Sequence, residues 1–240
     1  MVIPALDEED SLPLVLRAIP KSPLPGTEVV QVVVVDNGST DGTAAAARAG
    51  GATVVREERR GYGAACLRGI AALRDGIEAV VFLDADFSDH PDEMGLLLEP
   101  IVKGDADLVI GSRTLGARER GALPPQALWG NRLAVTLIRL FWGFRYTDLG
   151  PFRAIRRDSL AKLGMADRDY GWTIEMQIRA VEEGLRIAER PVSYRRRVGK
   201  SKISGTVSGT VRAGAKILWT IGRFSLKRKG RRSPCTPERK

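Results

Sequence analysis

The stretch AVVFLDAD, residues 79–86, joins a short apolar run to two carboxylates, Asp84 and Asp86. An apolar run of this length is typical of a strand buried on both faces of a parallel sheet. Side chains alternate along a strand, so both carboxylates are expected on one face, at the carboxyl end where open α/β sheets bind ligands. The pair is therefore a candidate divalent-metal site, although two exposed acids after a strand would give the same pattern.

The same alternation of short apolar runs and helical patterns extends through the first half of the chain. Strands are expected at residues 1–3, 29–35, 53–56, 79–83 and 108–110, and helices at 12–18, 42–49, 63–74 and 91–102. This order predicts an α/β fold with a mostly parallel central sheet flanked by helices. A chain of 240 residues is long enough for one large domain or at most two small ones.

The second half is less regular. Residues 114–126 combine glycine, proline and charged residues and predict a loop, and residues 127–144 form an amphipathic stretch. A C-terminal amphipathic helix is expected at 206–226, followed by a basic tail, 227–240, that is expected to be disordered.

Charge and rare residues exclude several classes of protein. The formal net charge is +9, but residues 1–120 have a net charge of −8 and residues 121–240 a net charge of +17. One histidine and two cysteines make a histidine-ligated zinc site, a Ser-His-Asp triad or a disulfide framework improbable. We expect a protein of a reducing compartment, without a secretory signal or a membrane-spanning segment.

Two upstream segments have the composition of ligand-binding loops. Asp36 ends the run VVVV and opens DNGSTDGT, where it could accept hydrogen bonds from a ribose or a base. A turn with a Ser39 or Asp41 helix cap is the alternative. The segment RRGYGAA, residues 59–65, could bring the Arg60 guanidinium and the backbone amides around Gly61 near a diphosphate.

Taken in order, these segments resemble the inverting family 2 glycosyltransferases. The matching pieces are IPALDEE (3–9), VVVVDNGSTDGT (32–43), RRGYGAA (59–65), FLDADFSDHPDE (82–93), GSR (111–113), DLGPFRA (148–154) and RVGKSK (197–202). The later pieces look most like the branch that contains dolichyl-phosphate mannose synthases and polyprenyl-phosphate sugar transferases. The family usually has asparagine where Asp7 stands, and its Thr-Ser-Gly-Phe-Arg pattern is replaced here by residues 149–153.

This resemblance implies a single GT-A domain over residues 1–205. Residues 1–113 would bind the nucleotide sugar and residues 114–205 the acceptor. The implied activity is metal-dependent, inverting transfer of a hexose from a UDP- or GDP-sugar to a polyprenyl phosphate. The implied nucleotide-sugar residues are Pro4, Asp7, Glu8, Asp36, Arg60, Gly61 and Asp84; Asp84 and Asp86 would hold Mg²⁺ or Mn²⁺, and Arg113, Arg197, Ser201 and Lys202 would meet the acceptor phosphate.

The chemistry of the acceptor decides whether a general base is needed. A phosphate is largely ionised at neutral pH, so it can attack the anomeric carbon without a strong base, while Asp86 with its metal and Arg113 stabilise negative charge. A soluble or cell-envelope hydroxyl acceptor, the alternative, would need a carboxylate base, for which Glu175 and Asp148 are the candidates. Glu175 could equally be an acid on a helix surface.

The basic second half suggests where the protein works. The helix at 206–226 and the basic tail suit the anionic inner face of the cell membrane, which implies a cytoplasmic, peripheral protein. Alternatively, the apolar stripe of this helix packs on the sheet or on a second copy in a homo-oligomer. A nucleic-acid-binding protein is disfavoured because no aromatic stacking strip or zinc module accompanies the charge.

Overall fold

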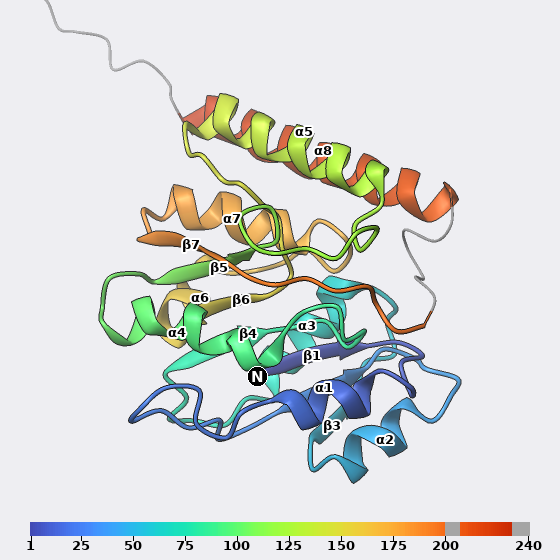
Figure 1. Ribbon diagram of the computed structural model, residues 1–240. Coiled ribbons are helices and arrows are strands. Elements are labelled where there is room, and N and C mark those ends of the chain that lie inside the picture. Colours follow the sequence, from blue (N-terminus) through green and yellow to red (C-terminus); the bar gives the residue numbers. More distant parts are fainter. Residues whose placement is uncertain (200–206, 232–240) are drawn as a thin grey trace, which may run out of the picture.

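The computed structural model describes residues 1–199 and 207–231, which form one central sheet with helices on both faces (Figure 1). Its strands are β1 (Val2–Ala5), β2 (Val33–Asp36), β3 (Thr53–Arg56), β4 (Ala79–Phe82), β5 (Leu108–Ser112), β6 (Arg153–Arg156) and β7 (Ile187–Pro191). They lie in the order β3-β2-β1-β4-β6-β5-β7. Only β6 is antiparallel to its neighbours, so the predicted mostly parallel α/β sheet is confirmed.

Helices precede or follow nearly every strand. They are α1 (Leu12–Ala18), α2 (Thr43–Ala49), α3 (Tyr62–Ala71), the 3₁₀ turn η1 (Pro91–Glu93), α4 (Met94–Val102), α5 (Pro125–Trp142), α6 (Arg157–Leu163), α7 (Trp172–Glu182) and α8 (Val207–Arg231). The C-terminal helix runs five residues past its expected end at Leu226, into the segment expected to be a tail. Residues 232–240 of that segment lie outside the described residues.

The sheet separates two hydrophobic cores. In β2, Val33 and Val35 belong to one core and Val34 to the other, as expected for a strand buried on both faces. The first core is covered by α3, α5, α6, α7 and α8, and the second by α1, α2 and α4. The run of β-branched residues that predicted this strand is therefore explained by burial on both sides.

The pair α5 and α8 forms an outer layer on α7. Figure 1 shows the two long helices side by side, beyond the end of the sheet formed by β5 and β7. Across the described residues, no helix is both long enough and apolar enough to pass through a bilayer.

The carboxyl ends of β1, β2, β4 and β5 point to the same edge of the sheet. Ala5 is level with Asp36 in the register of β1 and β2, and β4 and β5 run parallel to them on either side of β6. These strands and the segments that follow them contain the predicted site residues Pro4, Asp7, Glu8, Asp36, Asp84, Asp86 and Arg113. They therefore meet at one edge, where ligands of open α/β sheets bind.

One expectation about this edge is wrong in detail. β4 ends at Phe82, and Asp84 to Asp86 lie in the turn that follows it. Strand alternation therefore does not orient these two side chains. Their positions are set by contacts with other parts of the chain.

Candidate active site

The loops after β1 and β2 are joined by side-chain hydrogen bonds. Asp36 is buried, and its Oδ1 accepts a bond of 2.8 Å from the backbone amide of Ser39. Asp7 has a positive φ of 51°, and its Oδ1 accepts a bond of 2.7 Å from the amide of Thr40. Pro4, in β1, is partly exposed beside them. The four predicted nucleoside residues Pro4, Asp7, Glu8 and Asp36 thus occur in two adjoining segments.

The glycine loop before α3 packs on another loop of the protein. The amides of Gly63 and Ala64 donate to the carbonyls of Asp169 and Arg168 at 3.2 and 2.9 Å. Gly61 has φ +147°, and a Cβ there would lie 2.2 Å from the carbonyl oxygen of Arg168. The glycines therefore permit loop packing, and these amides are not directed at a diphosphate as we expected.

The two other predicted groups of this segment lie beside the loop after β2. The amide of Gly61 donates to Asn37 Oδ1 at 2.8 Å. The exposed Arg60 donates through Nη2 to the carbonyl of Gly38 at 3.1 Å. Arg60 therefore lies exposed beside the loop after β2.

The turn after β4 contains partly or fully buried acidic side chains whose negative charges repel one another. The Tyr62 hydroxyl of α3 donates to Asp84 Oδ1 at 3.0 Å. Asp86 Oδ1 accepts a bond of 2.9 Å from the amide of Ser88. Burial and the nearby charge of Asp86 raise the pKa of Asp84 to about 7. Two carboxylates are thus held close together where their charges are costly.

A third carboxylate, Asp89, adds to this charge. It is buried, and neither of its oxygens has a hydrogen-bond partner among the described residues. Burial, followed by the charge of Asp84, raises the pKa of Asp89 well above its usual range. A cation bound at the turn would relieve this repulsion.

Arg197 supplies part of the missing positive charge. Its Nη2 donates to Glu8 Oε1 at 2.6 Å, and its Nη1 lies 3.3 Å from Asp86 Oδ2. The amide of Val198 also donates to the Asp86 carbonyl at 3.0 Å, so this segment crosses the acidic turn. The side chain predicted to meet an acceptor phosphate therefore bridges two site acids. Ser201 and Lys202, predicted beside it, lie outside the described residues.

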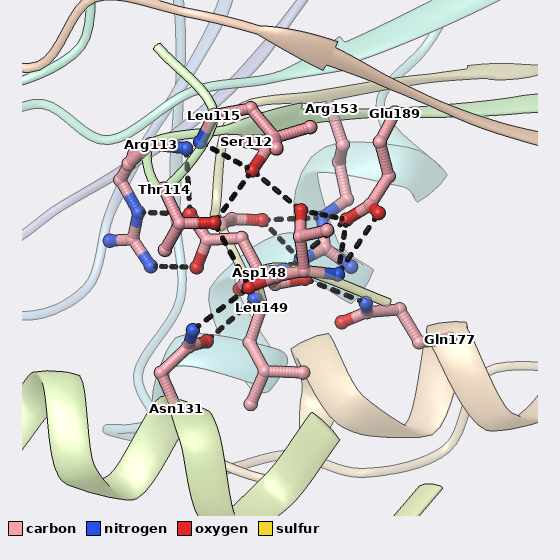
Figure 2. A network of polar contacts seen from close by, with 12 residues as sticks. Ser112, Arg113, Thr114, Leu115, Asn131, Asp148, Leu149, Arg153, Gln177 and Glu189 are labelled. Atoms are coloured by element: carbon pink, nitrogen blue, oxygen red, sulfur yellow. Dashed lines mark hydrogen bonds and ion pairs between the residues drawn. The ribbon is translucent and has the colours of Figure 1, made fainter. Parts of the chain in front are cut away.

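Arg113, directly after β5, is held by a buried carboxylate. Figure 2 shows its guanidinium facing Asp148, with Nε to Oδ2 at 2.8 Å and Nη2 to Oδ1 at 2.7 Å. The Arg113 amide donates to the same Oδ2 at 2.8 Å. Burial alone would lower the pKa of Arg113, but the charge and hydrogen bonds of Asp148 raise it above its usual value.

The loop that contains Asp148 is fixed from three elements (Figure 2). Glu189 of β7 accepts bonds from Thr147, Asn131 of α5 accepts one from the amide of Leu149, and Gln177 of α7 donates to the Asp148 carbonyl. The position of Arg113 therefore depends on α5, α7 and β7 together.

Glu175, a predicted candidate base, is engaged in structural contacts. It is buried, and its Oε2 accepts bonds from the amides of Ala166 and Asp167 at 3.1 and 2.6 Å. Its Oε1 accepts a bond from Arg179 Nε at 2.8 Å. The alternative of a surface acid is wrong, because the side chain lies inside the protein. Its contacts place the loop on which Gly63 and Ala64 pack.

Two residues of the site were not singled out from sequence. Tyr62 lies inside RRGYGAA. An aromatic residue between two glycines at the start of a helix could have indicated a role at the site. Asp89 was a third acid within six residues of Asp84, which was a signal for a denser acidic turn.

The acids of this turn fit a divalent cation that is shared with a substrate. No cluster of three or more acidic, histidine or cysteine side chains in the described ranges could hold a metal ion by itself. Mg²⁺ and Mn²⁺ commonly bind one or two carboxylates and complete their coordination with substrate phosphates. Asp84 and Asp86 match that donor set, and their mutual repulsion favours cation binding.

Comparison with known proteins identifies the class of enzyme. Residues 1–164 match the family described as Glycosyl transferase family 2, and the chain belongs to this family. It is a glycosyltransferase, as the motifs predicted.

Its relatives include proteins of known and unknown activity. An uncharacterized glycosyltransferase of Mycobacterium tuberculosis is 39% identical over 219 residues, covering 88% of this chain and 92% of the relative. The polyprenol monophosphomannose synthase of Mycolicibacterium smegmatis is 32% identical, covering 86% and 81%. The undecaprenyl-phosphate mannosyltransferase of Micrococcus luteus is 33% identical, covering 87% and 88%.

A solved structure of similar fold contains a donor and a metal. Glucosyl-3-phosphoglycerate synthase of Mycobacterium tuberculosis, in complex with Mn²⁺, UDP-glucose and phosphoglyceric acid, superposes with a TM-score of 0.69 and 28% identity. The match covers 92% of this chain and 78% of that one. The predicted GT-A fold is therefore confirmed.

Proposed function

We propose that this protein transfers a hexose, with inversion, from a UDP- or GDP-sugar to a polyprenyl phosphate. The names of two relatives, a polyprenol monophosphomannose synthase and an undecaprenyl-phosphate mannosyltransferase, support this acceptor. The donor class is supported by the UDP-glucose in the similar structure. The proposal depends most on how the candidate bases are bonded.

Neither candidate base is poised to take a proton from a hydroxyl. Asp148 is bonded to Arg113 through both oxygens, and Glu175 is bonded to two amides and Arg179. A hydroxyl acceptor needs a base within hydrogen-bonding reach, whereas a phosphate arrives already ionised. This arrangement favours the phosphate acceptor and is the observation that carries the proposal.

Different residues at this edge of the sheet would bind the donor, the metal ion and the acceptor. Asp7, Glu8 and Asp36 would bind the nucleoside, and Arg60 would approach the diphosphate. Asp84 and Asp86 would hold Mg²⁺ or Mn²⁺, which would neutralise charge on the leaving diphosphate. Arg113, fixed by Asp148, would orient the acceptor phosphate, and Arg197 would exchange its bond with Asp86 for substrate phosphate oxygens.

A second candidate acceptor is a small phosphorylated molecule. The similar structure holds phosphoglyceric acid. An acceptor of this kind also carries a phosphate that an arginine could orient. It differs from the first candidate because the attacking atom is a hydroxyl oxygen.

A donor and acceptor panel separates these activities. UDP-glucose, UDP-mannose, GDP-glucose and GDP-mannose should be tested with a short polyprenyl phosphate, the matching polyprenol and phosphoglyceric acid, with release of nucleoside diphosphate as the readout. We expect turnover with the polyprenyl phosphate and none with the polyprenol. Faster turnover with phosphoglyceric acid or the polyprenol would overturn the proposed acceptor.

Removal of divalent cations should stop the reaction. In the described residues, Asp84 and Asp86 do not belong to a cluster of three or more potential metal ligands, so a cation shared with substrate phosphates should exchange readily with a chelator. We expect nucleoside diphosphate release to disappear in excess EDTA and to return on addition of Mn²⁺ or Mg²⁺. Full activity in EDTA would contradict the metal assignment.

Replacing Tyr62 with phenylalanine should weaken cation binding. The change removes the donor to Asp84 Oδ1, a hydrogen bond that lowers the pKa of this carboxyl, so less of it would be ionised to bind the cation near neutral pH. We expect the Mn²⁺ concentration for half-maximal activity to rise about tenfold, the equivalent of a lost charge-assisted bond of about 1.4 kcal/mol. Tyr146→Phe is the matched control, because that buried hydroxyl donates to the Gln177 carbonyl instead. An equal rise in both variants would refute the specific role.

The proposed acceptor also implies a location. A polyprenyl phosphate is held in a membrane, so the protein would act as a peripheral protein on the anionic inner face of the cell membrane.

A further inference from the structure

The exposed large apolar side chains of this protein are concentrated on two helices. Seven of the eleven in the described residues belong to α5 and α8: Trp129, Leu133, Leu140, Phe141, Leu218, Trp219 and Leu226. These helices lie side by side as the outer layer beyond α7 (Figure 1). A concentration of exposed apolar side chains on two adjacent helices indicates a site of interaction.

The apolar row of α5 does not face the core. Trp129, Leu133 and Leu140 are spaced four and seven residues apart, which places them on one side of a helix. They are 77%, 45% and 73% exposed. The opposite side of α5, with Ala134 and Ile138, is buried in the first core. Core packing therefore explains only one of its two apolar sides.

The described part of α8 repeats this arrangement. Ile221 is buried and Phe224 packs against the same core, while Leu218, Trp219 and Leu226 project outward. The exposed Trp219 ring lies between two cations, with Lys216 Nζ 4.8 Å and Arg223 Cζ 5.3 Å from its centroid. An aromatic ring flanked by cations suits an environment that is apolar on one side and polar on the other.

The charge of the two helices is entirely positive. The sequence of α5 contains two arginines and that of α8 seven lysines and arginines, and neither contains an aspartate or a glutamate. The N-terminal half of the chain has the opposite net charge. A partner of this surface should therefore be anionic and should also accept a row of apolar side chains. An anionic bilayer satisfies both requirements, whereas a nucleic acid has no apolar interior into which Leu133 and Leu140 could insert.

We propose that α5 and α8 together form a docking platform that lies flat on an anionic bilayer, with the Trp129, Leu133 and Leu140 row entering the interface. Trp219 and Arg223 would rest at headgroup level beside this row, whereas Lys216 is paired with Asp167 and Asp169 of the protein itself. The platform deepens the proposed function and rests on it for its purpose. It assigns the membrane contact to α5 as well as to the C-terminal helix.

The same helices are connected to the candidate active site. Asn131, two residues after Trp129 in α5, bonds to Leu149 and Thr147 beside the Asp148 that holds Arg113. A helix lying on the membrane would thus place the proposed acceptor-phosphate residue near headgroup level, where the phosphate of a polyprenyl lipid resides.

Vesicle binding of the full chain tests the platform. The chain should co-sediment with vesicles of phosphatidylglycerol and phosphatidylcholine, and salt or removal of phosphatidylglycerol should weaken this binding. We expect the triple variant Trp129→Ser, Leu133→Ser, Leu140→Ser to partition at least about tenfold more weakly. The matched control is Leu96→Ser, Val102→Ser, which alters exposed apolar residues of α4. Equal thermal melting of both variants would show that they are folded.

The outcomes distinguish membrane docking from other uses of this surface, and they separate it from the proposed activity. Unchanged vesicle binding of the triple variant would overturn the platform, as would a wild-type dimer in solution that the triple variant lacks. Stronger binding to a single-stranded oligonucleotide than to vesicles would overturn it too. Turnover of a short, water-soluble polyprenyl phosphate without vesicles tests the activity alone. If that turnover fails while vesicle binding persists, the proposed function is wrong and the platform stands.

Discussion

Replacing Asp86 with asparagine should reduce sugar transfer by about a thousandfold or more, the size expected when charge stabilisation of a leaving group is lost. Asparagine keeps the shape of the side chain but removes its negative charge. The amide of Ser88 can still donate to the remaining carbonyl oxygen, so the turn should fold normally. The measurement is the initial rate of nucleoside diphosphate release at saturating donor and Mn²⁺.

The exposed Asp92 provides the control for this change. Asp92→Asn removes an acid six residues further along, at a side chain that is 65% exposed. Its activity should stay within about twofold of wild type, because an exposed charge is largely screened. If Asp86→Asn retained wild-type activity with an unchanged response to Mn²⁺, the acidic turn would not be the site of metal-assisted transfer.

The first half of the fold could be predicted because its signals are local. Val33 to Val35 of the VVVV run are buried on both faces, and α1 and β3 have the bounds that were expected. The second half contains β6, which begins and ends with arginine. Arg153 is buried completely, with its guanidinium donating to the carbonyls of Leu149, Gly150 and Thr173. No sequence pattern indicates such burial, since arginine is normally exposed.

The site residues likewise divide into those that local sequence signals predict and those that depend on the tertiary fold. Asp36 and Asp84 could be placed because each follows a recognisable strand, and parallel strands end at one edge. The ion pair of Arg197 with Glu8 joins residues 189 positions apart, and a pairing over such a distance depends on the tertiary fold. Glu175 has the sequence context of a surface helix acid, yet the packing of the loop at Ala166 makes it a buried acceptor.

Replacing Asp148 with alanine should destabilise the protein by about 3–5 kcal/mol, the range for removing one partner of a buried ion pair. Asp148 is fully buried and receives three bonds from Arg113, whose side chain is only 13% exposed. The variant would leave that guanidinium inside the protein without its counter-charge. Urea unfolding followed by circular dichroism measures the loss, and activity should fall with it because Arg113 loses its orientation.

A paired replacement separates the structural role of this ion pair from its proposed role in acceptor binding. In Arg113→Met, Asp148→Leu both charges are removed, and apolar side chains of similar volume often restore the stability that a single replacement loses. We expect this variant to regain most of the urea stability and still fail to transfer sugar to a polyprenyl phosphate. Arg113→Lys with Asp148 intact keeps the charge but loses the bidentate geometry, so it should retain partial activity with a raised KM for the acceptor. Full activity in the paired apolar variant would make Arg113 a structural residue and would require another group to meet the acceptor phosphate.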